Sequence, residues 1–408
     1  MIYIKKILWF LILTIVFASC AKTDTNQDDT QLIHGFKPIE KTNKTKLYMH
    51  YMPWFHSMEF SNFWGIHWQM STKNPENILP DGKREIASYY YPMIGPYDNG
   101  DPDVVDYHLL LMKYAGIDGV LIDWYGIHDV LDYGPNFKNS NALIEGLKRT
   151  GIEYAIVYED FTVEEVQKRT ELTAYEAAKM DMRYMEEHYF SSEFYITMDE
   201  KPLLMTFGPS YFKNKLQWKE IFGDLTDSIS FLPLWHHRYR VGEENSVGEF
   251  SWVDFTSDLE ELEQFYTDPE NEYIIGSAYP GFHDFYFDGG WGESYGYLDH
   301  FDGATLANTL AKAETHNVPI IQLVTWNDFG EGTMIEPTDE FQFSYLEMIQ
   351  DFAGVNYDKD ILETILDYYE KRKAFKTDPG IQLQLDTVFT ALADQEVLMA
   401  TDILSNIK

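Results

Sequence analysis

Short apolar runs alternate with longer helical patterns along most of the chain. The short runs are typical of buried parallel strands and span 47–51, 86–91, 119–124, 154–158, 202–206, 229–235, 273–279 and 320–326. Helical periodicity predicts helices between most of them, at 103–115, 139–149, 170–188, 213–222, 257–267, 303–316 and 341–353. Eight strands with intervening helices are the pattern of a single (β/α)8 barrel of the TIM type, an α/β fold.

The boundaries of this barrel follow from where the alternation begins and ends. We expect it to occupy 46–354, with an irregular link at 52–85. Helical patterns after Val355 predict a C-terminal helical extension, 355–408, that packs on the barrel. A doubly wound open sheet is the competing fold. No G-x-G-x-x-G follows a strand and no Walker loop occurs, which disfavours the nucleotide-binding versions of that sheet.

The N-terminus has the pattern of an export signal. Two lysines precede the apolar run 7–17, which is too short to span a bilayer, and the run leads to Cys20, the only cysteine. This resembles a bacterial lipoprotein signal, with 1–19 as the signal peptide and Cys20 as the lipidated first residue. The polar stretch 20–45 is expected to be a flexible tether. An ordinary signal peptide or an anchor helix with an incidental cysteine is the alternative.

The composition of the chain disfavours some classes of binding partner. The formal net charge of −36 repels nucleic acid and anionic lipid heads. We therefore expect no nucleic-acid partner and membrane contact only through the lipid anchor. Aromatic residues make up 16% of the chain, which indicates either a heavily aromatic core or a cleft lined with rings that stack on sugars.

One turn carries the strongest chemical signal. The segment 325–333, Thr-Trp-Asn-Asp-Phe-Gly-Glu-Gly-Thr, directly follows the apolar run 318–324 and sets Asp328 and Glu331 three residues apart. In a barrel, the carboxyl end of a strand lies on the face where catalysis takes place. Paired carboxylates are what glycoside cleavage requires. The alternative role for Asp328 is to cap the next helix.

The other predicted strand ends carry aromatic or acidic residues, whereas the opposite ends are plain. Among these residues are Trp54, Tyr97, Asp123, Trp124, Tyr125, Glu159 and Tyr279. This asymmetry predicts a binding face. Asp123 and Glu159 could instead be capping or salt-bridged residues.

Other hydrolytic chemistries lack their motifs. The histidines are scattered and show no metal-ligand spacing such as H-E-x-x-H. Lipidation would remove Cys20 as a nucleophile, and no G-x-S-x-G elbow occurs. We therefore expect neither a metal nor an organic cofactor.

Several segments resemble the endo-α-mannosidase and endo-α-mannanase family of glycoside hydrolases, family 99. They are Tyr51-Met52-Pro53-Trp54, Ile66-His67-Trp68, the stretches 88–97 and 115–125, Ser277-Ala278-Tyr279 and, most specifically, the stretch 326–337. The resemblance implies a (β/α)8 barrel that cuts an α-linked polysaccharide internally with two carboxylates. It assigns Glu331 as general acid and base. It assigns the position of Asp328 to a base, normally glutamate, that takes the proton of the sugar 2-hydroxyl.

The turn also departs from this family. Where family 99 usually has Trp-His between the two carboxylates, this chain has Phe329-Gly330. Trp-Asn-Asp-Phe-Gly-Glu looks closer to the family 71 α-1,3-glucanases, which invert the anomeric centre. Retention and inversion both remain open from the sequence.

The resulting hypothesis is an endo-acting glycoside hydrolase for an α-linked polysaccharide, α-mannan-like first and α-glucan next. Glu331 and Asp328 would be catalytic, and the expected substrate-binding residues are Asn327, Trp54, Trp68, Tyr97, Asp123, Trp124, Tyr125, Glu159 and Tyr279. We expect a monomeric lipoprotein at the outer membrane. The alternatives are a non-catalytic surface glycan-binding lipoprotein on the same barrel and a transferase.

Overall fold

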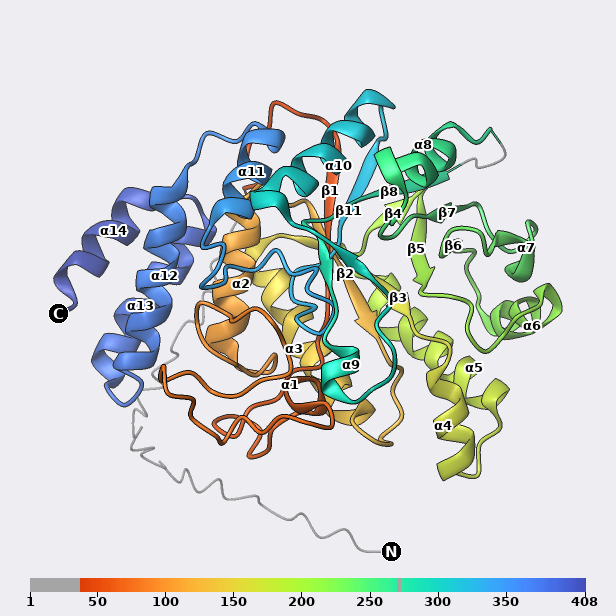
Figure 1. The fold of residues 1–408 in the computed structure, drawn as a ribbon, viewed down its shortest axis with the longest axis horizontal. Coiled ribbons are helices and arrows are strands. Elements are labelled where there is room, and N and C mark those ends of the chain that lie inside the picture. The colour runs from red at the N-terminus through yellow and green to blue at the C-terminus, as the bar shows by residue number, and fades with distance from the viewer. Residues whose placement is uncertain (1–36, 270–272) are drawn as a thin grey trace, which may run out of the picture. The chain divides into compact units, whose positions relative to one another are not determined.

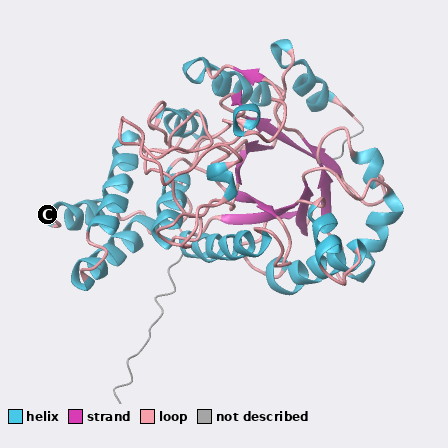
Figure 2. Cartoon of the chain, turned by 60° about the horizontal axis from the view of Figure 1, so that its bottom comes forward, coloured by secondary structure: helices cyan, strands magenta, loops and turns pink. Residues whose placement is uncertain are grey.

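A computed structural model of the protein describes residues 37–269 and 273–408, and Figure 1 shows the path of the chain. Its centre is a ring of parallel strands surrounded by helices (Figure 2). The ring consists of β1 (Lys46–Tyr51), β2 (Gly119–Trp124), β3 (Glu153–Tyr158), β5 (Lys201–Thr206), β6 (Ser230–Pro233), β7 (Gly248–Phe250), β8 (Tyr273–Ala278) and β11 (Ile320–Leu323). The predicted (β/α)8 fold class is therefore confirmed, and the open doubly wound sheet is excluded.

The order of the strands shows how the ring closes. Paired neighbours run β6-β5-β3-β2-β1-β11-β8-β7, all parallel. The two ends of this path meet through a parallel bridge between Leu234 and Phe250. Two backbone hydrogen bonds reinforce it, from Trp235 N to Phe250 O at 2.8 Å and from Val247 N to Phe231 O at 3.1 Å.

The strands are apolar because helices cover their outer faces and side chains fill the interior. Every residue of β2, Gly-Val-Leu-Ile-Asp-Trp, is buried, as expected for a parallel strand covered on both sides. The first barrel helix, α2, begins where the Asp101 side chain accepts the Asp103 backbone N–H and Pro102 takes the first helical position.

Two parts of the predicted strand pattern are wrong. The run 86–91 is not a strand, because it belongs to a long connection, 52–101, whose one helix is α1 (Ile66–Gln69). The eighth barrel strand is instead β7, Gly-Glu-Phe. Three residues are too short for a recognisable period-2 pattern, and β7 is specified by its pairing with β8.

Helices connect the strands on the outside of the ring. The barrel helices are α2 (Pro102–Tyr114), α3 (Tyr133–Thr150), α4 (Thr162–Arg169), α5 (Ala174–Met185), α6 (Lys215–Ile221), α7 (Arg238–Val241), α8 (Glu260–Thr267), α10 (Ala304–Thr315) and α11 (Ser344–Ala353). The short elements β4 (Thr197–Met198), β9 (Phe282–His283), α9 (Tyr286–Gly289) and β10 (Tyr297–Leu298) lie in the connections.

Three further helices follow the barrel, namely α12 (Lys359–Ala374), α13 (Pro379–Ala393) and α14 (Val397–Asn406). Of these, α12 and α13 pack beside α2, and α14 packs on α12 and α13, at the left of Figure 1. Arg372 of α12 pairs with Asp103 of α2 at 2.9 Å, and Tyr114 of α2 donates to Leu392 O of α13 at 2.8 Å. Apolar faces of α12 and α13 are thereby buried against the barrel.

The last part of the expected tether lies against the folded unit. Thr42 N donates to Gly354 O at 3.2 Å, Asn43 Nδ2 donates to Phe352 O at 3.1 Å, and Lys41 pairs with Asp118. The expected signal peptide, Cys20 and the remainder of the tether lie outside the described residues. No helix in the described ranges has the length and apolar character needed to cross a membrane.

Candidate active site

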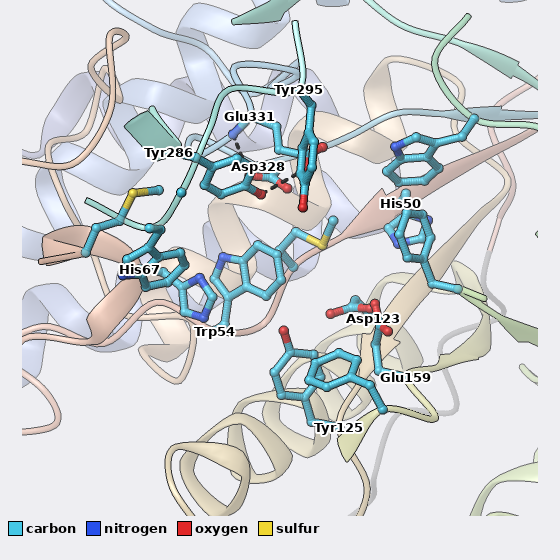
Figure 3. A pocket seen from close by; sticks show the side chains of 18 of the residues that line it. His50, Trp54, His67, Asp123, Tyr125, Glu159, Tyr286, Tyr295, Asp328 and Glu331 are labelled. Atoms are coloured by element: carbon cyan, nitrogen blue, oxygen red, sulfur yellow. Dashed lines mark hydrogen bonds between the residues drawn. The ribbon is translucent and has the colours of Figure 1, made fainter. Parts of the chain in front are cut away.

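A cavity of about 530 Å³ opens at the carboxyl ends of the barrel strands (Figure 3). It is lined by His50, Met52, Trp54, Phe55, His67, Met70, Asp123, Tyr125, Glu159, Phe161, Phe207, Trp252, Tyr286, Trp291, Gly292, Glu293, Ser294, Tyr295, Asp328, Gly330 and Glu331. This is the face on which barrel enzymes carry out their chemistry. The lining combines carboxyl groups with aromatic rings.

The carboxylate turn after β11 is held by its own hydrogen bonds. Thr325 Oγ1 accepts from Asp328 N at 2.8 Å, and Thr325 N donates to Thr333 O at 2.9 Å. Gly332 has a φ of +66°, and a Cβ there would lie 2.7 Å from His283 O, so only glycine fits. Asp328 and Glu331 consequently project from a closed and rigid turn.

Asp328 serves this turn as well as the cavity. Its Oδ1 accepts the backbone N–H of Glu331 at 2.9 Å, and its side chain is nearly fully buried. No helix begins directly after this turn, so Asp328 does not cap one. Its hydrogen bond to Glu331 N closes the turn itself. Burial raises the pKa of Asp328, and the backbone donors partly offset that rise.

Glu331 is partly buried, and its side chain lines the cavity. Burial and the neighbouring charge of Asp328 raise the pKa of Glu331 well above its ordinary value. Tyr286 Oη donates to Glu331 Oε1 at 3.0 Å and favours the ionised form. A carboxyl with such a raised pKa keeps its proton near neutral pH, as a general acid must.

A second pair of carboxyls points into the cavity from β2 and from the residue after β3. Asp123 and Glu159 are both buried and lie on the side of the cavity away from Glu331 (Figure 3). Burial raises the pKa of each, and their mutual contact raises that of Glu159 further. The contact with Glu159 lowers the pKa of Asp123 and so offsets part of the effect of burial there. No backbone N–H or hydroxyl of the described residues reaches Asp123 Oδ2.

The ionisable groups of the cavity are predominantly acidic. Five of its lining residues carry carboxyl groups, and no lysine or arginine is among the described residues that line it. The charges of the two pairs also affect each other, since Asp328 raises the pKa of Asp123 and Glu331 raises that of Glu159. An anionic ligand would meet repulsion on both sides.

His50 at the end of β1 supplies a hydrogen-bond acceptor. Gln322 donates its amide N–H to Ser251 O, which leaves Gln322 Oε1 to accept from His50 Nδ1 at 3.3 Å. The proton is thereby assigned to Nδ1, and Nε2 is left with a free lone pair and no partner in the described chain. Burial lowers the pKa of His50 to about 4, so the ring is neutral.

Aromatic rings form the remaining wall. The Trp54 ring stacks on His67 with centroids 4.1 Å apart, and Tyr125 lies edge-on to Trp54 at 6.2 Å. His67 in turn pairs with Asp132 at 3.6 Å. Flat faces fixed in this way are suited to the apolar faces of sugar rings.

The structure brings together six of the predicted site residues, namely Trp54, Asp123, Tyr125, Glu159, Asp328 and Glu331. The other five, Trp68, Tyr97, Trp124, Tyr279 and Asn327, are fully or almost fully buried and do not line the cavity. These five side chains therefore lie behind the wall of the cavity in this structure.

Trp124 shows one physical reason for this placement. It follows Asp123 directly on β2, so the two side chains point to opposite sides of the strand. Asp123 faces the cavity, whereas Trp124 packs outward on Phe137 of α3 and on Tyr189.

The remaining four buried residues support the walls from behind. Trp68 Nε1 donates to Tyr97 O at 2.8 Å, and Tyr279 Oη donates to Asp254 O at 3.1 Å. Asn327 joins the carboxylate turn to the segment after β1, because it exchanges two hydrogen bonds with the Met52 backbone, each at 2.9 Å.

Sequence reasoning missed other lining residues, above all His50, Trp252, Tyr286, Trp291 and Tyr295. Tyr286 and its neighbours lie in the connection after β8, and no motif marks them. They reach the cavity because His283 N donates to Glu331 O and Phe285 N donates to Gly330 O, each at 2.8 Å. Trp252 follows the end of β7 by two residues, so the pattern of aromatic residues at strand ends would have identified it if β7 had been predicted.

Comparison with known proteins gives partial matches. No model of a protein family matches the chain. A stretch of 136 residues is 28% identical to the human glycoprotein endo-alpha-1,2-mannosidase-like protein and covers 32% of this chain and 26% of that one. A stretch of 94 residues is 28% identical to the Xenopus laevis glycoprotein endo-alpha-1,2-mannosidase, with 20% and 21% covered. The chain thus spans about a quarter of the length of these curated relatives.

The solved structures extend the likeness over most of the fold. The GH99 endo-alpha-mannosidase from Bacteroides thetaiotaomicron superposes with a TM-score of 0.58 at 18% identity, over 78% of this chain and 98% of that one. A glycoside hydrolase-like protein superposes with a TM-score of 0.54 at 11% identity, over 78% and 96%. The resemblance to family 99 is confirmed in a stretch of sequence and in the fold. None of the comparisons reported bears on the family 71 resemblance.

Proposed function

We propose that the chain is an endo-acting glycoside hydrolase that cleaves a neutral α-linked polysaccharide, α-mannan-like in the first place. The observation that carries this proposal is the carboxylate turn at the mouth of the barrel. It places Glu331, with a raised pKa, next to Asp328 in a cavity walled by Trp54 and Tyr125. The endo-α-mannosidase names of the similar proteins support the choice of mannan.

Glu331 protonates the glycosidic oxygen as the bond breaks. Its enclosed position keeps the carboxyl neutral until that step, and Tyr286 stabilises the carboxylate that forms. Asp328 is the base, acting on the sugar 2-hydroxyl or on a water molecule. Because its Oδ1 is used by the Glu331 backbone, Oδ2 is the oxygen that takes the proton.

The opposite wall binds the sugar hydroxyls. Asp123 Oδ2 has no hydrogen-bond partner among the described residues, so it is assigned to accept from a sugar hydroxyl. His50, which also lines the cavity, supplies a second acceptor without a partner among the described residues, its Nε2. These acceptors suit the hydroxyls of a neutral sugar, whereas sulfate, phosphate or carboxylate substituents would face the unpaired carboxyls.

A glycan-binding protein without catalysis is the second candidate. It is favoured by the hydrogen bond from Glu331 N to Asp328 Oδ1, because a carboxylate that closes its own turn is less free to act as a base. Asp328 is also one methylene shorter than the glutamate that family 99 usually carries at this position. The aromatic wall would serve either function.

One experiment separates the two candidates. Purified protein that begins after Cys20 is incubated with α-mannan and with α-glucan, and new reducing ends are measured. We expect cleavage that Glu331→Gln lowers by about 10² to 10⁴, the usual contribution of a general acid, while binding in an affinity gel persists. Gel retardation without any new reducing ends from the wild type would establish the binding protein instead.

We also propose that the protein is a lipoprotein of the outer membrane, anchored through Cys20. The pattern of the N-terminal residues supports it: a basic start, a short apolar run and a unique cysteine. An anchored hydrolase would act where long glycans arrive at the cell.

A further inference from the structure

A second hollow borders the active-site cavity. This outer groove is lined by Tyr89, His283, Asp284, Phe287, Glu293, Ser294, Gly296 and Tyr297. Glu293 and Ser294 line both hollows, so they form a common rim between cavity and groove. A chain that leaves the cavity over this rim enters the groove directly.

The outer groove carries aromatic rings from the hairpin β9–β10, from α9 and from Tyr89 of the long connection after β1. Tyr297 pairs with His283 across the hairpin, and their rings meet edge to face at 4.9 Å. Tyr89 stacks on His283 from the other side, with centroids 3.9 Å apart. Tyr297 and Phe287 are nevertheless 59% and 66% exposed. The Tyr297 ring, which is held by His283 and still exposed, can stack on a ligand at little entropic cost.

The segment that carries these rings is preformed. The buried carboxylate of Asp284 accepts from Tyr286 N at 3.2 Å, from Ser294 Oγ at 2.8 Å and from Tyr295 N at 2.8 Å. This single side chain therefore closes the loop that separates cavity from groove. The same segment is bonded to the carboxylate turn, through His283 N to Glu331 O. Groove and catalytic turn are thus parts of one hydrogen-bonded unit.

The groove has the same chemistry as the cavity. Its ionisable acids are Glu293 and the buried Asp284, and no lysine or arginine is among the described residues that line it. Exposed rings together with carboxylate acceptors suit an uncharged polyhydroxyl chain, and the acidic groups disfavour nucleic acid and acidic peptides. Apolar protein partners would find few aliphatic side chains there.

We propose that the outer groove is a distal subsite that binds further sugar units of the glycan whose scissile bond lies in the cavity. The inference rests on the proposed function, since it concerns the same substrate chain. Sugar units stack on Tyr297 and Phe287 and donate hydroxyl protons to Glu293. The protein consequently gains affinity and rate as the glycan lengthens past the rim.

Tyr297→Ala tests the subsite against Tyr297→Phe, which keeps the ring. Tyr239→Ala is the matched control, because Tyr239 is 72% exposed on α7 and lines neither hollow. The probes are linear α-mannooligosaccharides from the disaccharide upwards, and kcat/KM is measured for each length. We expect Tyr297→Ala to reduce the gain from short to long chains roughly threefold to tenfold, the range of one aromatic stacking contact. Tyr297→Phe should retain that gain, and Tyr239→Ala should match the wild type.

The failure of this inference is distinct from failure of the proposed function. If the wild type cleaves the oligosaccharides but Tyr297→Ala shows the same length dependence, the subsite is refuted and the hydrolase stands. If the wild type cleaves none of them, the proposed hydrolase activity is refuted for these probes. The subsite is then tested by calorimetric measurement of the affinity for each oligosaccharide of the same series. A length-dependent affinity that falls in Tyr297→Ala would support it, and equal affinities or no binding would overturn it. Circular dichroism establishes that each variant is folded.

Discussion

Removal of the Tyr286 hydroxyl should shift the ionisation of Glu331. In the structure Tyr286 Oη donates a hydrogen bond to Glu331 Oε1 at 3.0 Å. This hydrogen bond stabilises the ionised form of Glu331 and so lowers its pKa. Tyr286→Phe keeps the ring that lies against Trp291 and removes the donor. Because a donor to the charged form lowers the pKa of a carboxyl, its loss must raise the pKa of Glu331 still further.

The size of this shift follows from the energy of the bond. A hydrogen bond to a charged group contributes about 1.5–3 kcal/mol, and one pKa unit corresponds to about 1.4 kcal/mol. Glu331 is only partly buried, so water replaces some of the lost interaction and the lower end of the range applies. We expect the pKa of Glu331 to rise by about one unit.

Two measurements check this value. If Glu331 is the general acid, the alkaline limb of the pH profile of kcat/KM should move up by about one unit in Tyr286→Phe. A ¹³C NMR titration of labelled glutamate carboxyls reports the same shift without substrate, with Glu331→Gln identifying the signal. Tyr295→Phe is the control, since Tyr295 lines the cavity and its hydroxyl has no hydrogen bond to Glu331 among the described contacts. An unchanged or lowered pKa in Tyr286→Phe would refute the reasoning.

Three other predictions follow from the site and the N-terminus. Burial and Asp123 raise the pKa of Glu159, so the folded protein holds a proton that the unfolded chain releases above about pH 4.3, and stability falls as pH rises beyond that value. Thermal unfolding should therefore show a gain for Glu159→Gln over the wild type that grows from about pH 5 to pH 8, and a constant or shrinking gain would contradict the assignment. Sulfated or uronate-containing oligosaccharides should bind Glu331→Gln at least about tenfold more weakly than neutral ones of equal length, because the cavity holds carboxyls and no lining lysine or arginine among the described residues; equal affinities in calorimetry would sink the electrostatic argument. Full-length Cys20→Ala should no longer partition into the detergent-rich phase, and partitioning like that of the wild type would rule out the lipid anchor.

Much of the barrel could be predicted from the sequence because parallel strands covered by helices are apolar throughout. Seven of the eight barrel strands begin and end within a few residues of the apolar runs. The run 86–91 misled the prediction because its tyrosines pack in an irregular connection. β7 escaped it because its three residues obtain their strand conformation from pairing with β8.

The carboxyls of the site were also accessible from sequence. Asp123, Glu159, Asp328 and Glu331 follow or end strands, and the carboxyl ends of parallel strands meet on one face of a barrel whatever the connections do. Their convergence on one cavity therefore follows from the strand pattern alone.

Only the tertiary structure decided which aromatic rings reach that cavity. Trp124 faces outward because it alternates with Asp123, and Trp68 is buried against Phe55 within the long connection after β1. Tyr286 reaches Glu331 because a segment more than forty residues earlier in the chain pairs with the carboxylate turn. A strand and its end are local properties that a period of apolar residues specifies. The direction of a ring in a loop depends on backbone hydrogen bonds to distant segments, which no local pattern encodes.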